Sequence, residues 1–159
     1  MTQATDPILV LTTGGTIDKL YFDALSEYKI GESIITRILE TARVTQPVEI
    51  REVLRKDSLD LNDADRALIA DAVADAASRR VVITHGTDTM THTAQALGDV
   101  AGKTVVLVGA LAPARFAESD ATFNLGMAFA TAQVAPPGVY ITMNGTVFRA
   151  DAVVKDRER

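Results

Sequence analysis

The sequence has no cysteine and only two histidines, His85 and His92. The lack of cysteine excludes disulfides, thiolate nucleophiles and zinc sites built on sulfur, and two histidines are too few for a multi-histidine metal cage. An excess of basic charge is also missing, since 16 Lys and Arg residues face 21 Asp and Glu residues and the net charge is −5. We therefore expect no metal site and no nucleic-acid partner, because nucleic-acid binding needs a basic stripe.

Long apolar runs are absent as well. No stretch approaches the roughly 18 apolar residues that indicate a membrane span. The first residues, MTQATDP, carry no basic region ahead of an apolar stretch, so we expect no signal peptide and no membrane contact. The 159 residues fit one domain, and 47% hydrophobic with 23% charged residues is typical of a globular protein. We expect a cytoplasmic α/β protein.

Five short aliphatic runs, most of them closed by glycine, are typical of buried strands in a parallel sheet. The runs are 8–11, 48–54, 81–84, 104–108 and 139–143. Amphipathic stretches between them predict helices over 34–42, 63–77, 89–97 and 121–132.

In the second of these helices, Asn62 is a suitable N-cap. We expect one buried stripe on it, made by Leu68, Ala72, Val73 and Ala76. The alternation of strands and helices predicts a doubly wound, mainly parallel sheet flanked by helices, with a Rossmann-like or flavodoxin-like three-layer arrangement.

Two loops that follow predicted strands are rich in hydroxyl side chains and glycine. Residues 13–17 read TGGTI and residues 85–90 read HGTDTM. In open α/β sheets the ligand site lies beyond the carboxyl ends of the strands, so both loops are candidates for chemistry. Neither contains the G-x-G-x-x-G fingerprint or a P-loop. The alternatives are a tight turn at 13–17 and helix capping at 85–90 by Thr87 or Asp88. We expect His85 to orient a neighbour and His92 to be structural or exposed.

In this order, and about 70 residues apart, the two loops resemble the two signature segments of the bacterial-type L-asparaginase/glutaminase family. Four further segments resemble that family, and together they cover essentially the whole chain. They are residues 57–60 (DSLD), 108–113 (VGALAP), 119–125 (SDATFNL) and 143–147 (MNGTV), the last followed by Lys155.

The resemblance implies catalytic roles for particular residues. Thr16 matches the threonine nucleophile, which attacks the side-chain amide and forms an acyl-enzyme. Thr87, Asp88 and Lys155 match a second cluster that activates a hydroxyl or a water molecule. The family also uses a tyrosine in the loop after the first signature, and Tyr21 and Tyr28 both remain candidates for it.

The resemblance also implies a substrate pocket. Ser58 and Asp88 would bind the α-carboxylate and α-amino groups of the substrate, and backbone amides near Thr16 and Thr87 would bind the oxyanion. The remaining residues implied to contact the substrate are Gly15, Leu59, Gly86, Thr87 and Ala110. Leu59 departs from the family pattern, in which this position is usually polar, and this puts one substrate contact in doubt.

The function that the resemblance implies is hydrolysis of L-asparagine to L-aspartate and ammonia, without a metal or an organic cofactor, in a homodimer or homotetramer. Two alternatives are a non-catalytic amino-acid-binding module of the same fold, and an amidase acting on glutamine or on an amide linked to transfer RNA. Residues 1–159 correspond to a single N-terminal-type domain without the C-terminal domain of the family. We therefore expect either a short-chain branch or an incomplete chain.

Overall fold

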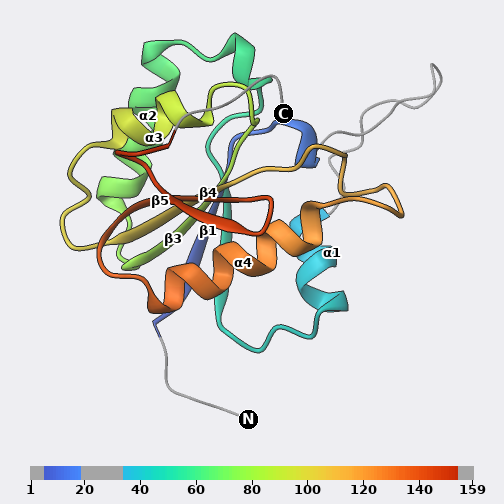
Figure 1. Cartoon of the computed structure of the whole chain (residues 1–159). Coiled ribbons are helices and arrows are strands. Elements are labelled where there is room, and N and C mark those ends of the chain that lie inside the picture. The colour runs from blue at the N-terminus through green and yellow to red at the C-terminus, as the bar shows by residue number, and fades with distance from the viewer. Residues whose placement is uncertain (1–5, 19–33, 154–159) are drawn as a thin grey trace.

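A six-stranded sheet forms the centre of the computed structural model, which describes residues 6–18 and 34–153 (Figure 1). The strands lie in the order β2-β1-β3-β4-β5-β6. Their bounds are β1 Ile8–Thr12, β2 Val48–Glu52, β3 Arg80–Thr84, β4 Thr104–Val108, β5 Gly138–Met143 and β6 Thr146–Arg149. The first five strands run parallel and β6 runs antiparallel to β5. This arrangement confirms the predicted α/β fold with a mainly parallel sheet.

Helices cover both faces of the sheet. One face packs against α1 (Ile34–Thr41) and α4 (Ala121–Val134), and the other packs against α2 (Asp63–Asp75) and α3 (Met90–Leu97). Because side chains alternate along a strand, Val10 packs in the cluster of Leu125 while Leu11 packs in the cluster of Ile69 on the opposite face. The predicted three layers are confirmed. Within the described residues, no helix is long and apolar enough to cross a bilayer.

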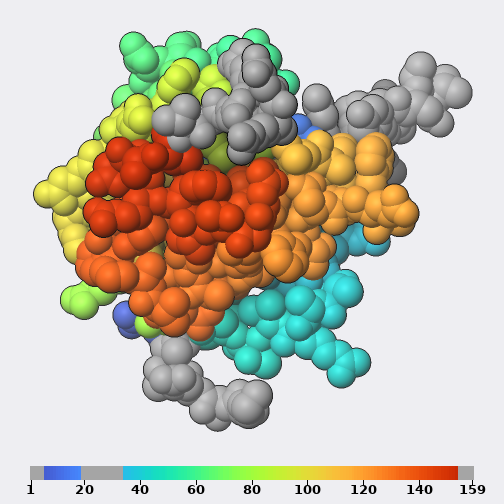
Figure 2. Space-filling model, viewed as in Figure 1, coloured from blue at the N-terminus to red at the C-terminus, as the bar shows by residue number. Residues whose placement is uncertain are grey.

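A hairpin near the carboxyl end of the chain goes beyond the five strands predicted from the sequence. The structure continues β5 through a two-residue turn into β6, with φ of 55° at Asn144 and 71° at Gly145. Both residues tolerate positive φ, and Asn-Gly is the preferred pair for this turn because its twist matches that of the paired strands. The hairpin and α4 form much of one surface of the molecule (Figure 2).

The buried stripe of α2 differs from the predicted one. Val73 and Ala76 are buried and Ala72 is partly buried, but Leu68 was expected inside and is 53% exposed, while Asp65 and Ile69 are buried in addition. Contacts at the N-terminus of the helix explain the burial of Asp65. Asn62 caps the helix as predicted, and its own N–H donates to the Asp65 carboxylate. The same carboxylate forms an ion pair with Lys56 at 2.9 Å. These contacts keep the Asp65 side chain buried, on the same face of the helix as the buried side chains of Ile69 and Val73.

Candidate active site

The loops that follow β1, β2, β3 and β4 meet at the carboxyl edge of the sheet. Thr13 donates both its N–H (3.2 Å) and its hydroxyl (2.6 Å) to the Thr84 carbonyl, which joins the first loop to the third. Lys56 N–H donates to the Thr13 carbonyl at 3.1 Å, and His85 N–H donates to the Val108 carbonyl at 2.9 Å. The two loops rich in hydroxyls are therefore held side by side through backbone contacts.

Glycines allow the two candidate loops to touch. Gly15 has φ of +88°, and a Cβ there would lie 2.5 Å from the Gly86 nitrogen. A Cβ on Gly86 would lie 2.6 Å from Ser58 Oγ. Contacts this short leave no room for a methyl group at either position. Gly15, Ser58 and Gly86, three residues implied to bind substrate, are therefore brought together.

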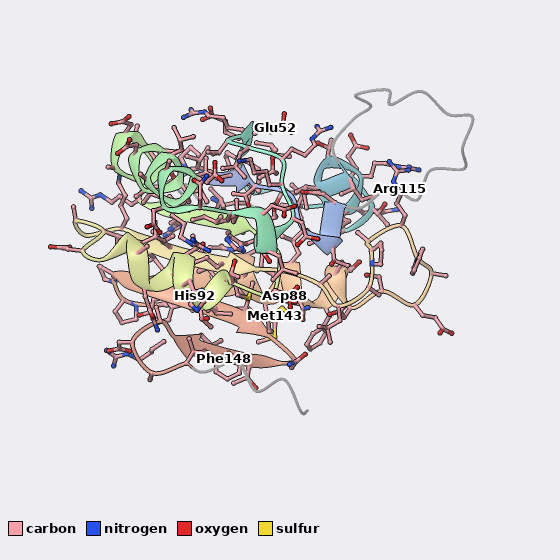
Figure 3. The ribbon with its side chains drawn as sticks, turned by 90° about the horizontal axis from the view of Figure 1, so that it is seen from above. Glu52, Asp88, His92, Arg115, Met143 and Phe148 are labelled. Carbon is pink, nitrogen blue, oxygen red and sulfur yellow. The ribbon has the colours of Figure 1, made fainter. Side chains whose placement is uncertain are left out.

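Thr16 and Thr87 are next in the chain to the two glycines of this contact. Thr16 directly follows Gly15 and opens the short 3-10 turn Thr16–Asp18, which is anchored by the buried side chain of Ile17. Thr87 directly follows Gly86, and both threonines are partly exposed. Asp88 comes next, also partly exposed, in the loop that leads into α3 (Figure 3). The hydroxyls of Thr16 and Thr87 and the carboxylate of Asp88 therefore belong to two backbone segments that touch each other.

Ser58 has a buried hydroxyl next to these segments. It is 1% exposed and opens the 3-10 turn Ser58–Asp60, which Asp57 caps by accepting the Leu59 N–H. Among the described residues, Ser58 Oγ has no hydrogen-bond partner. A buried hydroxyl without a partner is costly, and a bound polar ligand would remove that cost. Leu59, by contrast, is 64% exposed.

Side-chain capping does not account for the polar run at residues 85–90. The N-cap of α3 is Thr89, and no side-chain cap bond forms there. The Thr89 hydroxyl instead donates to the Ser58 carbonyl at 2.8 Å, which ties the second loop to the third. The N-cap residue of α3 is therefore neither Thr87 nor Asp88, and the Thr89 side chain bonds to the second loop instead of capping the helix.

The loop after β4 is organised by Asp120, whose carboxylate accepts the N–H groups of Leu111 and Ala112 at 2.9–3.0 Å. Asn124 donates from Nδ2 to that carboxylate at 2.9 Å and to the Gly109 carbonyl at 3.0 Å. Ala110 lies inside this loop and is 1% exposed.

Two titratable groups at this edge have shifted pKa values. Burial raises the pKa of Asp18 to about 6, against the lowering effects of the Arg55 charge and a hydrogen bond with Thr84, while Glu52 raises it further. Burial lowers the pKa of His85 to about 4 and the Arg66 charge lowers it further, against a hydrogen bond to the Gly86 backbone. His85 is therefore neutral at pH 7. Neither Asp18 nor Arg66 stands out in the sequence.

Three residues implied to be catalytic, Tyr21, Tyr28 and Lys155, lie outside the described residues. His92 is exposed on α3. Within residues 6–18 and 34–153, no group of three or more acidic or histidine side chains is placed to hold a metal ion. The described residues that match the family pattern therefore supply hydroxyls, the Asp88 carboxylate and backbone groups, which is a set suited to acyl transfer.

Comparison with known proteins gives consistent matches. The family model described as Asparaginase, N-terminal, matches residues 7–158. The L-asparaginase of Thermococcus kodakarensis is 34% identical over 158 residues, which are 93% of this chain and 47% of that protein. The solved structure of L-asparaginase I from Vibrio cholerae superposes with a TM-score of 0.82 at 31% identity, covering 97% of this chain and 49% of that one.

A relative with a different activity in its name also matches. It is a component of the glutamyl-tRNA(Gln) amidotransferase of Pyrobaculum aerophilum, and it is 36% identical over 130 residues, which are 78% of this chain and 28% of that protein. The chain thus spans about half the length, or less, of the curated relatives it matches.

Proposed function

Because this chain belongs to the asparaginase family, by its match to the N-terminal domain over residues 7–158, we propose that it hydrolyses a side-chain amide. The proposed substrate is L-asparagine, and the products are L-aspartate and ammonia. The observation that carries the proposal is the contact between Gly15 and Gly86, the residues that directly precede Thr16 and Thr87. Hydroxyls on two touching segments would supply a nucleophile and a second group able to direct a proton or a water molecule.

The proposed reaction starts at Thr16. Its hydroxyl oxygen attacks the amide carbon, and a C–O bond forms as the hydroxyl loses its proton to Tyr21 or Tyr28. The tyrosine passes this proton to the amide nitrogen, the C–N bond breaks and ammonia leaves, so that an aspartyl ester remains on Thr16. A water molecule, activated by the cluster of Thr87, Asp88 and Lys155, then hydrolyses the ester and releases L-aspartate.

Backbone N–H groups at the contact would stabilise the negative charge of the tetrahedral intermediates. Preorganised donors of this kind are among the largest contributors to catalysis of acyl transfer. The N–H groups nearest to the two hydroxyls are those of Thr16 and Thr87, and the interlocked glycines fix both segments. A hydroxyl nucleophile supported by backbone donors requires no metal and no organic cofactor.

Recognition of the amino acid would use Ser58 and Asp88. The buried Ser58 hydroxyl, which lacks a partner among the described residues, would donate to the α-carboxylate of the substrate. The Asp88 carboxylate would accept from the α-amino group. The exposed Leu59 cannot donate a hydrogen bond through its side chain, so this position would contribute at most an apolar contact.

The test is an ammonia-release assay with L-asparagine, L-glutamine and glutaminyl or asparaginyl transfer RNA, run beside calorimetric titration with L-asparagine. We expect ammonia release from L-asparagine, and less from L-glutamine. Binding of L-asparagine without ammonia release would indicate a non-catalytic module instead. Release from the RNA-linked amide alone would favour the alternative of an amidase that acts on an amide linked to transfer RNA.

We also propose that the chain acts as a homodimer or homotetramer, since a symmetric partner is the commonest way for a protein to cover such a site. Sedimentation at working concentration measures this directly. A fully active monomer would contradict it. The cytoplasmic location remains a prediction.

A further inference from the structure

A positively charged residue lies on the inner side of α2. Arg66 comes one turn before the buried Ile69 and two turns before the buried Val73, and its own side chain is only 13% exposed. The carboxylate of Asp63, 3.9 Å from Arg66 Nη1, is itself fully exposed and compensates the charge weakly. Withdrawing a guanidinium group from water is costly, so its hydrogen bonds inside the protein are informative.

Arg66 begins a chain of hydrogen bonds that ends at the candidate active site. While its Nη1 donates to the Leu61 carbonyl at 3.3 Å, its Nε donates to Thr93 Oγ1 at 3.3 Å, and Thr93 is fully buried on α3. Thr93 Oγ1 lies 2.7 Å from His85 Nε2, and His85 Nδ1 lies 2.7 Å from the Gly86 carbonyl oxygen. The chain crosses from α2 through α3 to the loop that carries Thr87.

The chemistry of the groups fixes the direction of each bond. A carbonyl oxygen only accepts, so His85 Nδ1 must carry the proton that it shares with Gly86. The ring is neutral, so Nε2 is unprotonated and accepts from the Thr93 hydroxyl. The Thr93 oxygen in turn accepts from Arg66, which only donates. In each of the three hydrogen bonds, the donor is therefore on the side of Arg66 and the acceptor is on the side of the Gly86 carbonyl. The positive charge of Arg66, which can only donate, favours this direction.

Holding the Gly86 carbonyl also orients the next N–H group. The peptide between Gly86 and Thr87 is planar, and its C=O and N–H point in opposite directions. With the carbonyl fixed toward the buried His85 ring, the Thr87 N–H is directed away from that ring. Gly15 and Ser58 both approach this segment at Gly86.

We propose that Arg66 is a positioning residue that acts through Thr93 and His85 to fix the Gly86–Thr87 peptide, so that the Thr87 N–H and hydroxyl face the substrate. The proposal rests on the proposed function, in which these two groups of Thr87 take part in acyl transfer. Arg66 touches no reacting atom on this account. Its removal should lower kcat and leave KM nearly unchanged, because oxyanion stabilisation is needed in the transition state and less in the bound substrate.

The first arm of the test is kinetic. Thr93→Val keeps the size of the side chain and removes its hydroxyl, Thr93→Ser keeps the hydroxyl, and Arg66→Met keeps most of the apolar stem. We expect Thr93→Val and Arg66→Met to lower kcat about ten- to a hundredfold, with KM changed less than about threefold, and Thr93→Ser to restore most of kcat. The matched control is Thr131→Val, which removes a buried hydroxyl that bonds the Met127 carbonyl within α4.

Thr131→Val should lower the melting temperature by an amount similar to Thr93→Val and leave kcat unchanged. Equal kcat losses in both variants would mean that any buried hydroxyl matters in the same way, and would overturn the positioning role. So would a Thr93→Val variant with full kcat.

The second arm needs no activity. Nitrogen-15 NMR of the ring nitrogens distinguishes protonated from unprotonated nitrogen, and a His92→Gln variant identifies the signals of His85. In the unmodified chain at pH 7 we expect a proton on Nδ1 and none on Nε2. In Arg66→Met and Thr93→Val we expect His85 to be a mixture of its two tautomers and the Thr87 amide signal to shift. In Thr131→Val we expect neither change.

A proton on Nε2 in the unmodified chain, or an unshifted Thr87 amide in both variants, would overturn the proposal. A chain that releases no ammonia but shows the expected NMR changes would contradict the proposed function and leave the hydrogen-bond chain supported. The two failures are therefore distinguishable.

Discussion

The loop that carries Thr16 and the loop that carries Thr87 are held in place by different means. The first, residues 13–18, is held by backbone bonds, by the bond of the Thr13 hydroxyl to the Thr84 carbonyl, and by glycines that let it approach Gly86. The second, residues 85–89, is held by side-chain bonds, with the buried His85 bonded to the Gly86 carbonyl and the partly buried Thr89 bonded to the Ser58 carbonyl. Substitutions that add atoms to the first loop should therefore lower activity and stability most there. In the second loop, substitutions that remove a hydrogen bond should have the larger effect.

The largest expected effect separates the chemical roles of the two loops. Thr16→Ala removes the proposed nucleophile, and the chain has no serine in that loop and no cysteine at all to replace it. We expect kcat to fall at least ~10³-fold with an unchanged circular dichroism spectrum. Thr41→Ala, at the exposed end of α1, is the control and should keep full activity. Retention of more than a tenth of the activity would remove Thr16 from the role.

A second experiment asks whether the Thr87 loop works as a unit with the end of the chain. Asp88→Asn and Lys155→Met should each lower kcat by roughly 10²–10³-fold, and the double variant should be little worse than the single ones. Residues that act together show this non-additivity, whereas independent residues do not. A double variant whose loss equals the product of the two single losses would place Lys155 outside the cluster.

Glycine substitution tests how the first loop is held. In Gly15→Ala, the new methyl group would lie 2.5 Å from the Gly86 nitrogen at a φ of +88°, so one of the two loops must move. We expect about a hundredfold loss of kcat and a lower melting temperature. The control is Gly126→Ala in α4, where a Cβ would meet nothing within 4 Å and should stabilise the helix by about 0.5–1 kcal/mol. Similar behaviour of the two variants would contradict the interlocking of the loops.

The smallest expected effect concerns pH, to which the two loops respond with opposite sign. The raised pKa of Asp18 means that its contribution to stability is complete below pH 3.8 and is lost as pH rises through about 6. The lowered pKa of His85 means that its contribution is complete above pH 6.5 and is lost as pH falls through about 4.

Asp18→Asn removes only the first of these dependences. We expect the variant to be more stable than the unmodified chain at pH 8, by at most about 3 kcal/mol, and to lose that advantage toward pH 4. Melting temperatures of both proteins across this range measure it. An advantage that grows toward low pH would have the wrong sign and would contradict the buried position of Asp18.

Much of this arrangement could be predicted from the order of residues. Aliphatic runs closed by glycine located five strands, and the Asn62 cap located the start of α2, because these signals are local. The hairpin to β6 was missed although its Asn144-Gly145 turn is also a local signal. The last predicted strand ended at residue 143, so residues 146–149, which run back beside it after the turn, were not predicted as a strand.

The support behind the Thr87 loop could not have been predicted in the same way. A charged residue among apolar ones predicts an exposed position, but the Arg66 side chain is largely buried and bonds to Thr93 and to the Leu61 carbonyl. The contacts of Thr93 and Asp120 join segments that only tertiary packing brings together. Periodicity locates a helix, but it does not specify which polar group lies opposite its buried side.

The central claim is that Thr16, and not Thr87, forms the covalent bond with the substrate. The most direct measurement is rapid acid quenching during turnover of L-asparagine, followed by proteolysis and mass spectrometry of the peptides that contain each threonine. The account predicts an added aspartyl group on the Thr16 peptide, absent in Thr16→Ala and accumulating when Lys155→Met slows deacylation. An aspartyl group on the Thr87 peptide, with none on the Thr16 peptide, would contradict it.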